Sequence, residues 1–88
     1  MKPVVYILKS NTGKYYIGST DNLERRLIQH NNGYTHSTKR MGHMIVVFYQ
    51  EYENLKDARM VESRIKKLKR KDFIEKIVKE GYIKITPR

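Results

Sequence analysis

The feature that most constrains the fold of this chain is a pair of β-favouring runs joined by turn-forming residues. The runs are Val4–Leu8 and Tyr15–Ile17, and Asn11-Thr12-Gly13 lies between them. This pattern predicts a β-hairpin with a three-residue loop and with Gly13 in the left-handed conformation. A loop of this length pairs Ser10 with Lys14 and therefore fixes which residues face each other across the hairpin.

The same register predicts where the tyrosines point. Tyr6 is placed opposite Gly18 and diagonal to Tyr16, so all three share one face of the sheet. Tyr15 points to the other face, which favours a place in the core. Because glycine has no side chain, we expect Gly18 to leave an open space beside the two phenol groups.

A helix is predicted directly after the hairpin. Asp21 resembles an N-cap, and Glu24 follows three residues later, as in a capping box. The helix should run from about residue 22 to 31 and end near Asn32-Gly33. At about 100° per residue, His30 falls on the apolar face of this helix and Arg26 at the edge of that face.

The rest of the chain predicts one more strand and two more helices. Residues 44–52 form the strand, Asn54 caps a helix over about 55–70, and a shorter helix around 73–78 stops at Gly81. Residues 82–86 alternate weakly and predict a short strand or an ordered tail. The order β-β-α-β-α-α indicates an α/β (α+β) fold, with a small, largely antiparallel three-stranded sheet flanked by helices.

Length and composition narrow the class of protein. We expect 88 residues to form one domain over 1–88, with one modest core over about 2–78 and a C-terminal tail over 79–88. The absence of cysteine excludes disulfides, thiolate nucleophiles and cysteine-based metal sites. The apolar run at the start is too short for a signal peptide or a membrane span, so we expect a cytoplasmic protein that does not enter membranes.

Charge points to a polyanionic partner. Lys and Arg number 19 against 9 Asp and Glu, which gives a net charge of +10. A basic surface on so small a domain favours nucleic acid first and an anionic membrane surface second. A well-solvated basic protein without such a partner is the alternative.

Five polar side chains are predicted to turn toward the core. Taken singly, each has a structural explanation; Glu62, near the apolar stripe of its helix, has Lys66 one turn away as a salt-bridge partner. Taken together, five such groups are costly to bury without a function. They are Tyr6, Tyr16, Arg26, His30 and Glu62.

These residues resemble the motifs of the GIY-YIG nuclease superfamily. Its two name-giving strands are matched by Val4-Val5-Tyr6 and Tyr16-Ile17-Gly18, its helix motif by Arg26 and His30, and its later glutamate by Glu62. The first motif departs from the family pattern, since it reads VVY in place of GIY. No appended DNA-binding domain is visible, so the chain resembles the small standalone, single-domain branch of the family.

The resemblance implies metal-assisted hydrolysis of a phosphodiester bond. Glu62 would hold a single Mg²⁺ or Mn²⁺, and Arg26 would stabilise the transition state. For the general base the family offers Tyr6 or Tyr16, helped by His30. A tyrosine pKa near 10 lies about 3 units above neutral pH, which makes histidine the easier proton acceptor, and the choice among the three stays open.

We therefore expect a metal-dependent DNA endonuclease, structure-specific and related to repair or recombination. It would act as a monomer or weak homodimer. The alternative is a nucleic-acid-binding module of the same fold with little or no activity. Salt-dependent contacts with the nucleic-acid backbone are expected from the basic residues, although a solvated helix face explains part of the run equally well. The expected contact residues are Gly18, Lys39, Arg40, Arg64, Lys66, Lys67, Lys69, Arg70 and Lys71.

Overall fold

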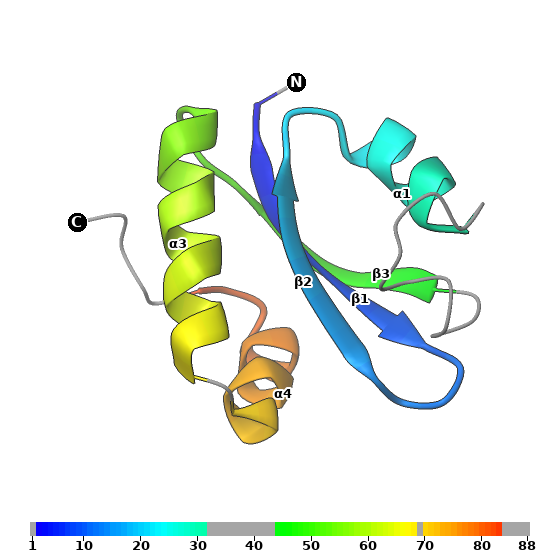
Figure 1. The fold of residues 1–88 in the computed structure, drawn as a ribbon. Helices are drawn as coiled ribbons and strands as arrows, with labels where there is room; N and C mark the ends of the chain where they lie inside the picture. Colours follow the sequence, from blue (N-terminus) through cyan, green and yellow to red (C-terminus); the bar gives the residue numbers. More distant parts are fainter. Residues whose placement is uncertain (1, 32–43, 69, 84–88) are drawn as a thin grey trace.

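The computed structural model describes residues 2–31, 44–68 and 70–83. Its elements follow the predicted order β-β-α-β-α-α (Figure 1). They are β1 (Val4–Ser10), β2 (Tyr15–Thr20), α1 (Leu23–Asn31), β3 (Met44–Glu51), α3 (Leu55–Leu68) and α4 (Lys71–Glu80).

The hairpin between β1 and β2 has the predicted register. The Ser10 amide donates to the Lys14 carbonyl at 2.8 Å, and the Gly13 amide donates to the Ser10 carbonyl at 3.0 Å. Gly13 has a φ of 87°, in the left-handed region that favours glycine. Tyr6 accordingly pairs with Gly18, as the sequence predicts.

The sheet is antiparallel throughout, with strand order β2-β1-β3. The central strand β1 is therefore covered by a strand on each side, which leaves β2 at one edge. Against β3 the register shifts between Ile7, which pairs with Phe48, and Leu8, which pairs with Val46. The extra residue in β3 is Val47, as expected of a β-bulge.

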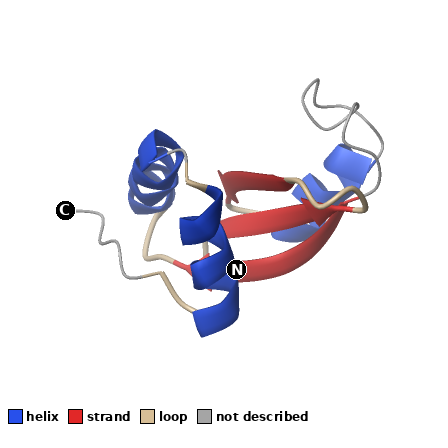
Figure 2. Ribbon diagram, turned by 90° about the horizontal axis from the view of Figure 1, so that it is seen from below, coloured by secondary structure: helices blue, strands red, loops and turns tan. Residues whose placement is uncertain are grey.

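Two hydrophobic clusters, one on each face of the sheet, replace the single core expected from chain length. That expectation is wrong because alternate residues of β1 point to opposite faces and nearly all of them are buried. Val5 and Ile7 pack toward α3 and α4, whereas Val4, Tyr6 and Leu8 pack toward α1. Figure 2 shows α3 and α4 on one side of the sheet and α1 on the other.

The cap of α1 differs from the prediction. Asn22, not Asp21, is the N-cap: its Oδ1 accepts the Arg25 amide at 3.0 Å, and its carbonyl accepts the Arg26 amide at 3.1 Å. The Thr20 hydroxyl accepts the Asn22 amide at 3.1 Å, and this turn delays the helix by one residue. Asp21 instead lies 3.5 Å from the Arg25 guanidinium, with both side chains exposed. The expected end of α1 near residues 32–33 lies outside the described residues.

The boundaries of α3 and α4 are close to the predicted ones. Asn54 caps α3, because its Oδ1 accepts the Asp57 amide at 2.8 Å. α3 stops at Leu68, two residues before the predicted end, because Arg70 has an extended backbone and is the N-cap of α4. Gly81 ends α4 with a φ of 82°, as predicted.

Packing continues beyond the boundary expected at residue 78. Ile83 is only 6 % exposed and joins the cluster under α3 and α4. Its amide donates to the Gln50 Oε1 at 2.9 Å. Tyr82 and Ile83 are not in a strand, and residues 84–86 lie outside the described part. None of the described helices is both long and apolar enough to cross a membrane.

We predict that Asn22→Ala lowers the free energy of unfolding by about 1 kcal/mol, the usual cost of losing an N-cap. Asp21→Ala should cost at most about 0.5 kcal/mol, because it removes only an exposed ion pair. Urea unfolding followed by circular dichroism measures both. A larger loss for Asp21→Ala than for Asn22→Ala would contradict the assignment of the cap.

Candidate active site

Four of the five predicted catalytic side chains come together around the edge strand β2. Tyr6 comes from β1, Tyr16 from β2, Arg26 from α1 and Glu62 from α3. The charges of Tyr16, Arg26 and Glu62 all act on the Tyr6 hydroxyl, so these groups lie within electrostatic range of one another. His30 is the fifth; its backbone belongs to α1, but its side chain lies outside what the structure describes.

The two tyrosines pack against each other on the α1 side of the sheet. Their ring centroids are 6.5 Å apart, and the rings are inclined by 29°. Tyr6 is completely buried, whereas Tyr16 is partly exposed. Tyr6 therefore holds a fixed position, whereas part of Tyr16 remains accessible to solvent.

The open space expected beside Gly18 is absent, because the Tyr6 phenol fills it. A Cβ at Gly18 would meet the Tyr6 hydroxyl and would lie 2.5 Å from its Cζ. Gly18 is itself buried. The glycine is thus required by the close approach of Tyr6, and its predicted contact with nucleic acid stays a prediction.

Arg26 and Tyr6 form a hydrogen bond on the face of the sheet that α1 covers. Burial raises the pKa of Tyr6 to about 12, against the opposing effect of a hydrogen bond with Arg26. The same hydrogen bond raises the pKa of Arg26. Arg26 Nη1 also lies 3.4 Å from Gln29 Oε1, while its Nε is buried and has no hydrogen-bond partner among the described residues.

Glu62 reaches the site from the opposite face of the sheet. One carboxylate oxygen accepts a hydrogen bond from Ser19 Oγ, and the other lies 2.7 Å from Lys66 Nζ. The Glu62 side chain is 19 % exposed, so part of the carboxylate remains accessible. This reach is possible because β2 is the edge strand, where no further strand separates the two faces.

Ser19 is a site residue that sequence reasoning missed. Strand alternation places Ser19 on the face opposite Tyr16 and Gly18, toward α3. The hairpin register already indicated which face of the sheet Ser19 occupies. Only the position of α3 shows that this face carries Glu62, the hydrogen-bond partner of Ser19.

Lys66 links Glu62 to Tyr16. Besides its ion pair with Glu62, its Nζ lies 5.8 Å from the centre of the Tyr16 ring, within reach of a cation–π contact. The pairing of Glu62 with Lys66 that the sequence allowed is therefore present. This ion pair does not separate Glu62 from the candidate site, because the charge of Glu62 also acts on Tyr6.

The donor set around Glu62 fits a cation held by one carboxylate and water, and does not form a cage of several carboxylates. Among the described residues, no group of three or more His, Cys, Asp or Glu side chains is placed to hold a metal. Glu62 opens onto a groove shared with Arg59, Ser63, Lys66 and Lys67. The Lys66 ammonium shows that this carboxylate already attracts positive charge, and a hard divalent ion suits such an oxygen donor.

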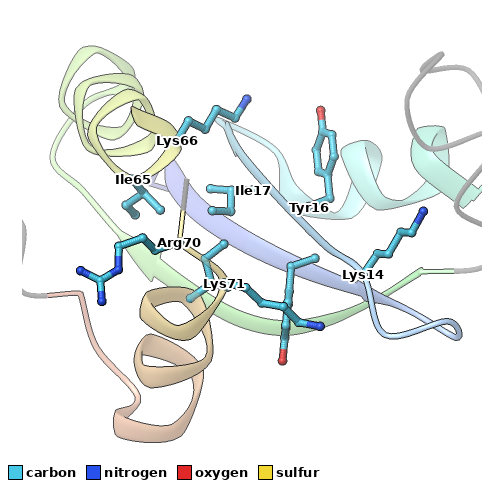
Figure 3. A pocket seen from close by; sticks show the side chains of 9 residues that line it. Lys14, Tyr16, Ile17, Ile65, Lys66, Arg70 and Lys71 are labelled. Atoms are coloured by element: carbon cyan, nitrogen blue, oxygen red, sulfur yellow. The ribbon is translucent and has the colours of Figure 1, made fainter. Parts of the chain in front are cut away.

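The predicted nucleic-acid contacts other than Gly18 divide into three groups. Lys66 and Lys67 lie beside Glu62, and Lys66 also joins Arg70 and Lys71 at a second groove (Figure 3). Arg64 is exposed on α3 and lines neither of these two grooves. Three of the predicted contacts lie outside the described residues: Lys39, Arg40 and Lys69.

Comparison with known proteins gives one family. The sequence model of the GIY-YIG catalytic domain matches residues 2–77. A UPF0213 protein of Clostridium perfringens is 39% identical over 74 residues, covering 83% of this chain and 80% of the relative. A UPF0213 protein of Enterococcus faecalis is 36% identical over 83 residues, covering 90% and 86%. No solved structure gave a significant match.

We predict that Gly18→Ala lowers the free energy of unfolding by about 1–3 kcal/mol, the usual cost of overpacking. In a Tyr6→Ala background the same substitution should cost clearly less, because the phenol that meets the added methyl group is gone. A double-mutant cycle in urea measures this coupling. Equal costs in both backgrounds would contradict the close approach of Tyr6 to Gly18.

A second prediction concerns alkaline pH. With a Tyr6 pKa of about 12, the folded chain keeps a proton that the unfolded chain releases near pH 10. The stability contributed by this group is fully present below about pH 10 and is lost as pH rises toward 12. Urea unfolding between about pH 9 and 11 should show a shallower loss for Tyr6→Phe than for wild type.

Tyr49→Phe is the matched control for this pH experiment, because Tyr49 lies in β3 and its side chain is 58% exposed. Its pH profile should follow that of the wild type. A Tyr6→Phe profile that also follows the wild type would contradict the raised pKa.

Proposed function

This chain belongs to the GIY-YIG family, and from that membership we propose that it is a metal-dependent endonuclease that hydrolyses phosphodiester bonds in DNA. We further propose, from the family alone, that its substrates are structure-specific DNAs of repair or recombination. The observation that carries the proposal is that Arg26 from α1 and Glu62 from α3 both lie within electrostatic range of the Tyr6 hydroxyl on β1. A fold of this size has no structural need for that assembly.

Arg26 is the residue proposed to contact the phosphate. Its buried Nε has no acceptor among the described residues, and an unsatisfied buried donor costs about 1–3 kcal/mol. A phosphate oxygen would provide that acceptor. The planar, permanently charged guanidinium then stabilises the extra negative charge of the transition state.

Glu62 is the residue proposed to hold Mg²⁺ or Mn²⁺. When bound there, the ion supplies positive charge to the phosphate and to the leaving oxygen. Ser19 orients one oxygen of the carboxylate through its hydrogen bond. Lys66 competes for the other oxygen, so it must release Glu62 when a divalent ion binds.

The protonation state of Tyr6 narrows the choice of proton acceptor. With a pKa of about 12, its phenol is ionised in only about one molecule in 10⁵ at pH 7. Tyr6 is therefore assigned as a neutral, completely buried group that holds Arg26 in position through their hydrogen bond. The proton passes to Tyr16 or His30, and the partly exposed position of Tyr16 suits contact with the substrate.

A second candidate function is nucleic-acid binding with little or no cleavage. The observation that favours it is the ion pair between Glu62 and Lys66, which neutralises the carboxylate that the metal requires. The net charge of +10 would still give binding that weakens steeply with salt.

The test is a cleavage panel of supercoiled plasmid, branched DNA, single-stranded DNA and RNA, with Mg²⁺ or Mn²⁺. Glu62→Gln and Arg26→Lys should each lower the cleavage rate by about 10²–10³-fold, the usual effect of losing a group that stabilises the transition state. Glu75→Gln is the matched control, because it makes the same change at an exposed position of α4. This variant should cut like wild type.

Two outcomes would count against this proposal. Wild-type protein that binds DNA but cuts no member of the panel would support the binding module. Cleavage that survives Glu62→Gln would show that the activity does not depend on this site.

A further inference from the structure

A second groove lies beside the candidate active site, between β2, α3 and α4 (Figure 3). Its volume of about 510 Å³ falls within the range of small-molecule sites. The floor is apolar and aromatic, and four side chains form it: Tyr15, Ile17, Ile65 and Ile74.

The rim of this groove is cationic. Lys14 comes from the start of the hairpin's second arm, Lys66 from α3, and Arg70 and Lys71 from the start of α4. The described residues that line the groove include no Asp or Glu. Arg70 is paired with Asp72 at 2.8 Å and points away from Tyr16 in Figure 3. Lys66 is paired with Glu62 at 2.7 Å, so Lys14 and Lys71 are the cations that carry the argument.

An apolar floor under a cationic rim matches the two halves of a nucleotide. A nucleobase offers flat faces that pack on isoleucine and tyrosine, while its phosphate carries the negative charge that the lysines attract. A base inside a duplex has both faces stacked and its edge paired. Only an unpaired nucleotide can place its base in such a groove.

The groove is continuous with the candidate active site through two shared residues. Tyr16 and Lys66 line the groove, and both also belong to the assembly around Tyr6 and Glu62. In Figure 3 the Lys66 side chain extends from α3 toward the side of β2 that carries the Tyr16 ring. A nucleotide in the groove therefore lies next to the phosphate that would be cut.

We propose that this groove binds one unpaired nucleotide adjacent to the scissile phosphate and thereby directs cleavage to single-stranded or unpaired positions. This inference rests on the proposed nuclease function and adds its substrate class. It accounts for the side-by-side position of an apolar floor and a lysine rim.

The floor is tested by isoleucine-methyl NMR on wild-type protein without metal, titrated with thymidine monophosphate, thymidine or inorganic phosphate. We expect thymidine monophosphate to shift the methyl signals of Ile65 and Ile74, while that of Ile28, which is exposed on α1, stays in place. Thymidine should act only at higher concentration, and phosphate should leave the floor unchanged. Unmoved floor signals with the monophosphate, or equal shifts with phosphate, would overturn the proposal.

The rim is tested by two charge reversals on one helix, Lys71→Glu and Lys76→Glu. Both residues are exposed in α4 and change the net charge equally, but Lys76 does not line the groove. Binding to single-stranded DNA and to a hairpin duplex of equal length is measured in EDTA by fluorescence anisotropy. Lys71→Glu should weaken single-strand binding about tenfold more than Lys76→Glu and remove the preference over duplex.

Circular dichroism and thermal unfolding establish that both variants are folded before binding is compared. Equal losses in the two variants, or a wild type with no preference for unpaired DNA, would overturn the groove assignment. Because binding is measured without cleavage, a wild type that shows the preference but cuts nothing contradicts the proposed function and leaves the groove assignment standing.

Discussion

The close approach of the Tyr6 phenol to Gly18 is the constraint on which the rest of the site depends. Tyr6 is completely buried, and no side chain larger than hydrogen fits beneath it. This contact directs the Tyr6 hydroxyl to Arg26 and brings the ring against Tyr16. It exists only because the three-residue loop with Gly13 sets Tyr6 opposite Gly18.

The edge position of β2 is the second constraint. A strand in the middle of a sheet separates its two faces, so groups from opposite faces cannot meet across it. At the β2 edge, Glu62 from α3 and Tyr16 on the other face are linked through Lys66. The proposed catalytic groups and the proposed nucleotide groove therefore share one border of the sheet.

Local signals in the sequence were sufficient for most of the fold. The hairpin register, the cap at Asn54 and the stop at Gly81 all follow from residues within a few positions of one another. The cap of α1 was assigned one residue too early because the Thr20 hydroxyl, which determines it, acts on the backbone of Asn22. The end of α3 was placed too late, since apolar periodicity does not register the extended residue Arg70.

By itself, the sequence determined the element order, the face shared by Tyr6, Tyr16 and Gly18, and the basic charge that favours nucleic acid. These depend on strand alternation, turn chemistry and composition, which are local or additive. Only the tertiary structure decided that Ser19 and Lys66 engage Glu62, that Tyr6 is buried enough to stay protonated, and that a lysine-rimmed groove adjoins Tyr16. Each of these depends on how α3 and α4 pack against β2, and side-chain contacts between elements distant in sequence leave no periodic signal along the chain.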